Sequence, residues 1–313
     1  MSAVAEARKA EPVRASRPRR RGRGSETVAK WMFLVPAIAY VLIFFGYPVV
    51  QNLVMSFQEY TTKTFFTGEA PWVGFANYAE VVGSYVFGTA LANTALFTLG
   101  SIVGQFVIGL AFALFFHRKF PLSNVLRSLL LLPWLIPIIA GTSVWKWILD
   151  QDGGVLNQAL GTVGIPPVPW LSSPDVALVA VVIVNIWIGI PFNATLLYSG
   201  LQNIPEELYE AAALDGATGW KAFWHITWPS LRPVVTVVLV LGVIYTLKVL
   251  EVILGLTGGG PANATATLAT ESYFRSFREF QFGEGAAVSN ILILFSLVFA
   301  VVYLRANRKQ VDE

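Results

Sequence analysis

Six long apolar segments constrain this chain more than any other feature of its sequence. Their approximate limits are 31–54, 90–116, 124–147, 176–200, 231–256 and 286–304. Each holds about 19 to 27 residues, enough for a helix rising ~1.5 Å per residue to cross ~30 Å of hydrocarbon. Because a backbone in lipid must satisfy its own hydrogen bonds, these segments are expected to be helices. The sequence therefore predicts an all-α polytopic membrane protein with six transmembrane helices.

Composition agrees with residence in a bilayer. Only 13% of the 313 residues are charged, against about 25% in a typical soluble domain. The chain has no cysteine, so disulfides and thiolate chemistry are excluded. Pro36, Pro133, Pro137 and Pro191 fall within or near the apolar segments. Each removes a helical hydrogen bond, so kinks are expected there.

The distribution of Lys and Arg predicts the orientation. Nine of the 22 lie in the first 30 positions. A six-span arrangement puts 17 on the side of the two termini and three in the loops 55–89, 148–175 and 257–285. This bias predicts cytoplasmic termini. The basic start could instead bind nucleic acid, but its place directly before a span favours a topology signal. The span 31–54 is too long for a signal peptide core and lacks a cleavage pattern, so it is expected to remain.

These features divide the chain into four parts. We predict a disordered basic tail over 1–28 and a first span with an outer loop over 29–89. A core of five helices over 90–304 and a short tail over 305–313 complete the chain.

The cytoplasmic connection 203–229 holds the most distinctive pattern. Pro205 suits the first turn of a helix, and the two acidic residues after it complement the positive end of that helix. Gly216 permits a bend, and an apolar pattern resumes before Pro229. The expected structure is a short helix, a glycine bend and a second helix beneath the membrane. Periodicity alone also fits a surface helix held at the interface by its tryptophans.

This connection closely resembles the EAA loop of ABC importer permeases. The matching residues are Glu210, Ala211 and Ala212, then Asp215, Gly216 and Pro229. Four further segments resemble the carbohydrate branch of type I importers, and the resemblance covers about residues 30–304. They are Phe75–Tyr78, Ala92–Thr94, Leu132–Trp134 with Pro137, and Leu256–Pro261.

The resemblance implies an ABC type-1 transmembrane domain in a bacterial inner or plasma membrane. It implies a second permease subunit, a dimeric cytoplasmic ATPase that binds ATP and Mg, and an extracytoplasmic binding protein that delivers a sugar or sugar-like solute. No cofactor is expected on this chain, and no nucleic acid partner. Glu210, Ala211, Ala212, Asp215 and Gly216 are then the residues that couple the permease to the ATPase.

The resemblance also implies that the fourth and fifth spans line the solute path. The candidate residues are Asn185, Gly189, Phe192, Gly242, Tyr245, Thr246, Lys248 and Glu251. Lys248 and Glu251 are three residues apart and are expected to share a helix face. Charges within a span are costly, so the two contact solute or form a structural ion pair. Asn290, in the sixth span, is expected to join helices by a hydrogen bond.

Two other classes of protein fit an apolar chain of this kind, namely a membrane-bound enzyme and a transporter or channel that works alone. The chain has no G-x-x-x-x-G-K-[ST] phosphate loop and only two histidines, so neither ATP hydrolysis nor metal or triad chemistry is expected. The main alternative is a stand-alone secondary transporter or channel. Such a protein would be expected to show several intramembrane carboxylates and inverted repeats, whereas this sequence offers Glu251 alone and no repeat.

Overall fold

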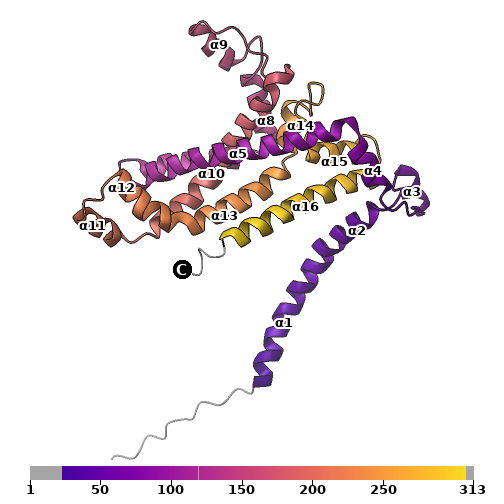
Figure 1. The fold of residues 1–313 in the computed structure, drawn as a ribbon, viewed down its shortest axis with the longest axis horizontal. Helices are drawn as coiled ribbons and strands as arrows, with labels where there is room; N and C mark the ends of the chain where they lie inside the picture. Colours follow the sequence, from indigo (N-terminus) through magenta and orange to yellow (C-terminus); the bar gives the residue numbers. More distant parts are fainter. Residues whose placement is uncertain (1–22, 119, 308–313) are drawn as a thin grey trace, which may run out of the picture. The chain divides into compact units, whose positions relative to one another are not determined.

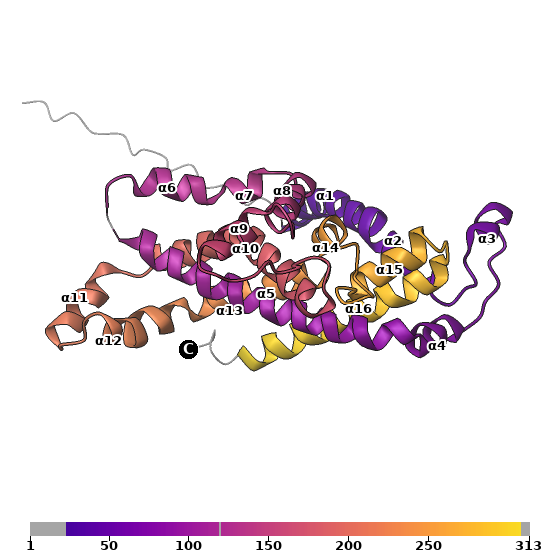
Figure 2. The same ribbon diagram turned by 90° about the horizontal axis from the view of Figure 1, so that it is seen from above.

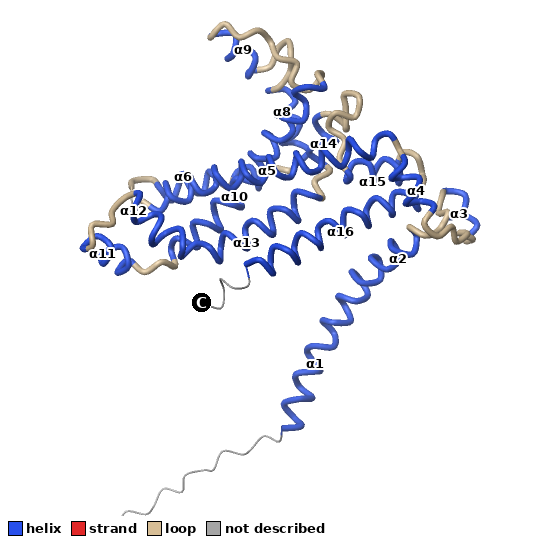
Figure 3. Tube along the Cα trace, in the orientation of Figure 1, coloured by secondary structure: helices blue, strands red, loops and turns tan. Residues whose placement is uncertain are grey.

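The computed structural model describes residues 23–118 and 120–307, and structural statements below refer to these residues. The chain divides into two units, 1–51 and 52–313, and each is described by itself. Within the described ranges the regular elements are helical, and two isolated β-bridges are the only strand-like pairs (Figure 3). The all-α prediction is therefore confirmed.

The first unit is a single helical stretch. Helix α1 spans Arg23–Val41 and passes through the π-helical turn η1, Leu42–Gly46, into α2, Tyr47–Met55, which extends into the second unit. Pro36 lies inside α1 without ending it. Residues 23–28 were predicted to be disordered, but they belong to this helix. The rest of the predicted tail, 1–22, lies outside the described residues, as do Lys119 and 308–313.

The second unit contains the remaining helices, which Figures 1 and 2 show from two directions. In chain order they are α3 (Thr62–Thr67), α4 (Ala76–Gly83), α5 (Tyr85–His117), α6 (Ser123–Leu130), α7 (Leu132–Leu135), α8 (Ile138–Ile148), α9 (Val155–Thr162), α10 (Pro174–Gln202), α11 (Glu206–Leu214), α12 (Trp220–Ala222), η2 (Phe223–Thr227), α13 (Trp228–Leu247), α14 (Glu251–Leu256), α15 (Leu268–Phe277) and α16 (Phe282–Asn307).

Five helical stretches are long and apolar enough to cross a membrane. They are Trp31–Met55, Tyr85–His117, Pro174–Gln202, Trp220–Leu247 and Phe282–Arg305. The third predicted span, 124–147, is not one continuous helix but the succession α6, α7 and α8, which Figure 2 shows one after another along the molecule. The breaks fall beside Pro133 and Pro137, where proline removes backbone donors. Pro191, in contrast, lies inside α10 without breaking it.

The fifth predicted span, 231–256, begins and ends elsewhere. Its helix starts at Trp220, because α12, η2 and α13 are continuous, and it stops at Leu247. The expected second helix beneath the membrane is therefore the base of this long helix. Residues 248–250 are not helical, and α14 follows as a separate short element.

Close packing of α5 against α10 forms the centre of the second unit. Gly100, Gly104 and Gly109 of α5 face Val182, Ile186 and Asn193 of α10. A Cβ atom on Gly109 would lie 2.6 Å from the Asn193 Cβ atom and 3.1 Å from the Ala194 nitrogen. Only glycine allows the two backbones to approach so closely, as small residues do in membrane helix pairs.

The segment Ala92–Thr94, which resembles importers, contacts the residues that follow the similar segment Leu256–Pro261. The Asn93 side-chain amide donates hydrogen bonds to the carbonyl oxygens of Asn263, Ala264 and Ala266. The Thr94 hydroxyl accepts one from the Leu268 backbone N–H at 2.9 Å. These bonds attach the loop after α14 to α5. Asn290 accepts a 2.9 Å hydrogen bond from Asn52, which confirms its predicted role in joining helices.

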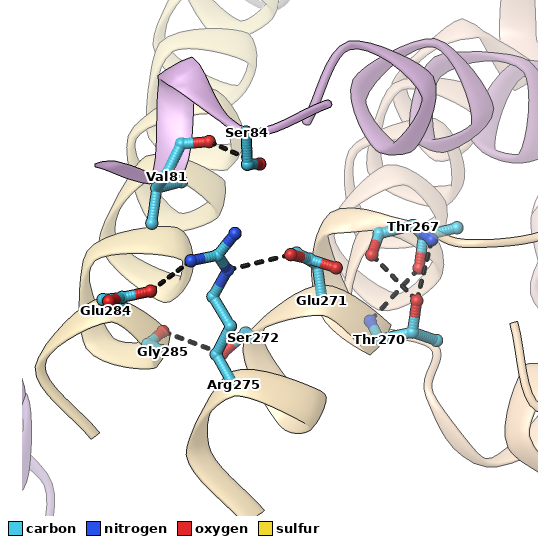
Figure 4. Close-up of polar contacts among 9 residues, drawn as sticks. All are labelled: Val81, Ser84, Thr267, Thr270, Glu271, Ser272, Arg275, Glu284 and Gly285. Carbon is cyan, nitrogen blue, oxygen red and sulfur yellow. Dashed lines mark hydrogen bonds and ion pairs between the residues drawn. The ribbon is translucent and has the colours of Figure 1, made fainter. Parts of the chain in front are cut away.

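A buried ionic cluster joins α15 to α16. The Arg275 guanidinium donates a 2.8 Å hydrogen bond to Glu271 and another to Glu284, as Figure 4 shows. Arg275 and Glu271 are each only 8% exposed. Burial acts to lower the pKa of Arg275, but the hydrogen bonds and charges of the two carboxylates outweigh it and leave the pKa raised. The raised pKa keeps Arg275 charged up to a pH above the normal arginine range. The stabilisation that the ionic cluster provides is lost only above that range and is therefore present at physiological pH.

Replacing Arg275 by leucine should strongly destabilise the α15–α16 pair. Arg275→Leu leaves two carboxylates facing each other in a buried site, which costs about 3 kcal/mol or more. We expect a clearly lower melting temperature for the purified protein in detergent. Arg278→Leu is the matched control, because Arg278 is exposed and contacts only the Phe274 ring, at 4.2 Å. Equal melting temperatures for the two variants would contradict a stabilising role for the cluster.

Candidate coupling segment and translocation face

Helix α11 carries the residues predicted to couple the permease to an ATPase. Pro205 is its N-cap, and Glu206 and Glu207 lie in its first turn, where carboxylates are favourable beside the positive helix end. At its other end the Gly216 N–H donates to the Ala213 oxygen and the Ala217 N–H to the Ala212 oxygen. This pair of bonds is a Schellman motif, which requires a left-handed residue. Gly216 supplies it with φ +75°.

One side of α11 is attached to the base of the fifth span. The Tyr209 hydroxyl hydrogen-bonds the Thr227 hydroxyl in η2 at 3.0 Å, and Ala212 is 8% exposed. The turn from Gly216 to Gly219, which has φ +55°, reverses the chain between α11 and α12. Because α12, η2 and α13 are continuous, the hydrogen bond from Tyr209 attaches α11 to a helical stretch of about 42 Å.

The other side of α11 has no partner within the described chain. Glu210, Ala211, Asp215 and Gly216 are all exposed there, and Leu214 is 91% exposed. This side of α11 thus exposes Leu214 together with Ala211 and the carboxylates of Glu210 and Asp215. Leu214 and Tyr209 were not among the predicted residues. The contact of Tyr209 with Thr227 joins residues 18 positions apart, and no pattern in the sequence indicates it.

The predicted path residues separate into two groups. Phe192 of α10 and Tyr245 of α13 are in edge contact, with ring centroids 5.9 Å apart, and Trp134 of α7 contacts Phe192 at 5.7 Å. The Lys248 ammonium lies 4.9 Å from the centre of the Tyr245 ring. These four residues form one aromatic and cationic row, in which Trp134, Tyr245 and Lys248 are exposed. We call it the aromatic row.

The remaining candidates in the spans lie in the packed interior. Asn185 is 3% exposed, and its backbone oxygen accepts a 2.9 Å hydrogen bond from Gln105 of α5. A Cβ atom on Gly189 would overlap the same Gln105 side chain. Gly242 and Thr246 are also buried. Of these four residues, Asn185 and Gly189 pack against Gln105 of α5, and sequence alone does not distinguish the buried group from the exposed one.

Lys248 and Glu251 do not share a helix face. Lys248 caps the end of α13, whereas Glu251 begins α14 beyond a non-helical stretch. Both side chains are exposed, and the ion pairs among the described residues are those of Arg275. The expectation of a shared helix face is therefore wrong, and the alternative of a Lys248–Glu251 ion pair is not realised. Among the described residues no group of three or more His, Cys, Asp or Glu side chains suits a metal ion.

Comparison with known proteins defines the class. Residues 105–310 match the family described as the inner membrane component of binding-protein-dependent transport systems. The chain belongs to this family, so it is a transport subunit rather than an enzyme, as predicted, and the stand-alone transporter is set aside.

Individual relatives are similar over most of their length. The chain is 35% identical to the trehalose/maltose transport system permease protein MalF of Thermococcus litoralis, covering 90% of this chain and 94% of that protein. It is 32% identical to the diacetylchitobiose uptake system permease protein DasB of Streptomyces coelicolor, covering 91% and 88%. In fold it matches a chain of a bacterial ABC transporter for the polysaccharide alginate, with TM-score 0.79, 23% identity and coverage of 91% and 96%. The type-1 transmembrane fold predicted from the sequence is thereby confirmed.

Replacing Gly216 should loosen the end of α11. Gly216→Ala forces a Cβ atom into a left-handed conformation, which costs about 1 kcal/mol. We expect the Ala217 amide to exchange with solvent about fivefold faster in hydrogen-exchange measurements. Gly161→Ala is the matched control, because Gly161 lies within α9 and its added Cβ meets nothing. Unchanged exchange at Ala217 in Gly216→Ala would contradict the capping role.

Proposed function

We propose that the chain forms half of the translocation path for a sugar or sugar-like solute and is driven by a cytoplasmic ATPase that docks on α11. The observation that carries this proposal is the attachment of an exposed acidic helix, through Tyr209 and Thr227, to the base of a continuous span. Family membership implies the other components: a second, related permease, a dimeric ATPase that holds ATP and Mg, and an extracytoplasmic binding protein.

The proposed coupling works by rigid displacement. When the ATPase closes, it moves α11, in which Glu210 contacts a basic group of the partner and Ala211 and Leu214 fill a groove. Asp215 and Gly216 keep the angle between α11 and α12. The movement passes to α13 and shifts Tyr245 and Lys248 in the aromatic row. A two-state element that both sites bias is what such coupling requires.

The distribution of cations supports an orientation with α11 in the cytoplasm. In the second unit, α11, α12 and the C-terminal end of α16 lie at one end, and α4 and α15 lie at the other (Figure 1). The end with α11 carries Arg118, Lys221, Arg232 and Arg305, an excess typical of the cytoplasmic face. We therefore propose a multi-pass protein of the bacterial inner or plasma membrane.

The aromatic row supports a carbohydrate as the solute. Aromatic walls with a few polar groups are typical of small-molecule sites, and Tyr245 and Lys248 offer hydrogen-bond donors to hydroxyl groups. Relatives named for trehalose/maltose, diacetylchitobiose and sulfoquinovosyl glycerol transport agree with this class. A solved alginate transporter of similar fold holds a pentasaccharide-bound periplasmic protein, and that supports the binding-protein partner.

Removing the Glu210 carboxylate should uncouple the transporter. A charge-assisted contact contributes about 1.5–3 kcal/mol, so Glu210→Ala is expected to lower solute-stimulated ATPase activity of the reconstituted complex roughly tenfold or more. Glu206→Ala is the control, because Glu206 is also exposed on α11 but lies one turn earlier. Stimulation at the normal level in Glu210→Ala would refute the docking role. Assembly of each complex is checked by co-purification of the subunits.

Removing the Lys248 ammonium should weaken solute handling without affecting docking. We expect Lys248→Met to raise the KM for solute uptake about fivefold, because a hydrogen-bond donor beside Tyr245 is lost, while basal ATPase activity stays unchanged. Lys146→Met is the control, since Lys146 is exposed near the end of α8 and outside the aromatic row. Identical uptake kinetics in both variants would remove Lys248 from the path.

A further inference from the structure

A hollow of about 310 Å³ lies where α5, α13 and α16 meet, apart from both sites described above. Figure 1 shows α13 running between the other two helices. The lining residues are Phe106, Trp228, Arg232, Val235, Thr236, Leu239 and Tyr303. Arg232 is the fifth residue of α13, and Tyr303 lies in the last turns of α16. The hollow is therefore near the end of the spans that carries α11.

The lining is layered in the same order as a phospholipid. Val235 and Leu239 form an apolar wall that extends along α13 beyond Arg232. The α11 end of the hollow holds the cation of Arg232 and the rings of Trp228, Tyr303 and Phe106, and the Phe106 ring contacts that of Trp228. Amphipathic aromatic rings and cations are characteristic of the headgroup level of a bilayer.

Arg232 has a charge that the described chain does not neutralise. Its side chain is exposed, and the ion pairs among the described residues belong to Arg275 instead. A cation on a membrane-spanning helix is costly unless it finds an anionic partner or reaches the interface. Any anionic partner of Arg232 therefore lies outside the described residues.

We propose that this hollow binds one anionic phospholipid, with its phosphate on Arg232 and an acyl chain along Val235 and Leu239. Basic pockets between transmembrane helices are suited to such headgroups. The volume is at the lower end of the ~300–1,000 Å³ typical of ligand pockets, so the hollow holds the phosphate region and the start of one chain.

The position of the hollow gives the lipid a regulatory effect. Trp228 directly follows Thr227, which bonds Tyr209 of α11, and its ring is in edge contact with Phe106 of α5 at 6.4 Å. A bound lipid would brace the base of α13 against its neighbours where displacement of α11 arrives. This consequence rests on the proposed coupling, whereas binding itself does not, so the test below measures binding.

The test is native mass spectrometry of the transporter purified with its partner subunits and equilibrated with equal amounts of phosphatidylglycerol and phosphatidylcholine. The normal protein should retain phosphatidylglycerol in preference. Arg232→Gln should lower this preference about fivefold, the factor that corresponds to ~1 kcal/mol for one interfacial cation. Arg232→Lys should keep most of it. Arg118→Gln is the matched control, with the same change of charge at the exposed end of α5, and it should bind as the normal protein does.

Two further measurements separate the lipid from other occupants. Thr236→Phe fills the hollow but keeps Arg232, so it should reduce retention of both lipids. A photoreactive residue in place of Thr236 should crosslink to lipid. Equal lipid preference in Arg232→Gln and Arg118→Gln would overturn the proposal. Displacement of the lipid by inorganic phosphate alone, or crosslinking mainly to the partner permease, would overturn it as well.

Discussion

The continuous helical stretch from Trp220 to Leu247, which includes the π-helical turn η2 and the two prolines Pro229 and Pro233, is the feature on which the rest of the structure depends. It makes the connection after α11 and the fifth span one mechanical element. A hinge between the two would absorb a displacement of α11, because loop residues change φ and ψ at little cost. This stretch contains no loop that could absorb such a displacement. The left-handed residues near its base, Gly216 and Gly219, both lie on the α11 side of the helix.

The helix from Trp220 to Leu247 packs against different neighbours at its two ends. Near its base, Leu231, Val235 and Val238 pack with Leu197 and Leu201 of α10. The α10 helix is in turn held against α5 by contacts that only glycine permits. Near the other end, Tyr245 and Lys248 are exposed, and the helix stops before the separate α14. The helix from Trp220 to Leu247 is thus packed against its neighbours at both ends, where Gly242 and Thr246 are also buried, and exposes Tyr245 and Lys248 at the end where a solute is proposed.

Much of this arrangement follows from the sequence, and the exceptions have physical causes. Hydrophobic length located the spans, since lipid leaves helices as the only option, and the pattern from Glu210 to Gly216 located α11. Length could not reveal that 124–147 breaks into three helices, because the breaks depend on how neighbours satisfy the backbone around Pro133 and Pro137. Nor could hydrophobic length show that the helix of the fifth predicted span ends before Glu251. Asn185 and Gly189 are predicted to line the path. The structure places the side chain of Gln105, some 80 positions earlier, against both residues, and the sequence could not show this contact.

Some polar groups have hydrogen-bond or ion-pair partners within the chain, and others do not. This difference separates structural groups from candidate functional groups better than their position in a span does. Asn93 has three carbonyl partners and Arg275 two carboxylates, so each is satisfied within the chain and acts as a brace. Glu210, Lys248 and Arg232 are exposed and have no ion-pair partner among the described residues. The three lie on different surfaces, namely α11, the aromatic row and the hollow beside α16. In the functions proposed above, these three surfaces meet a motor, a solute and a lipid respectively.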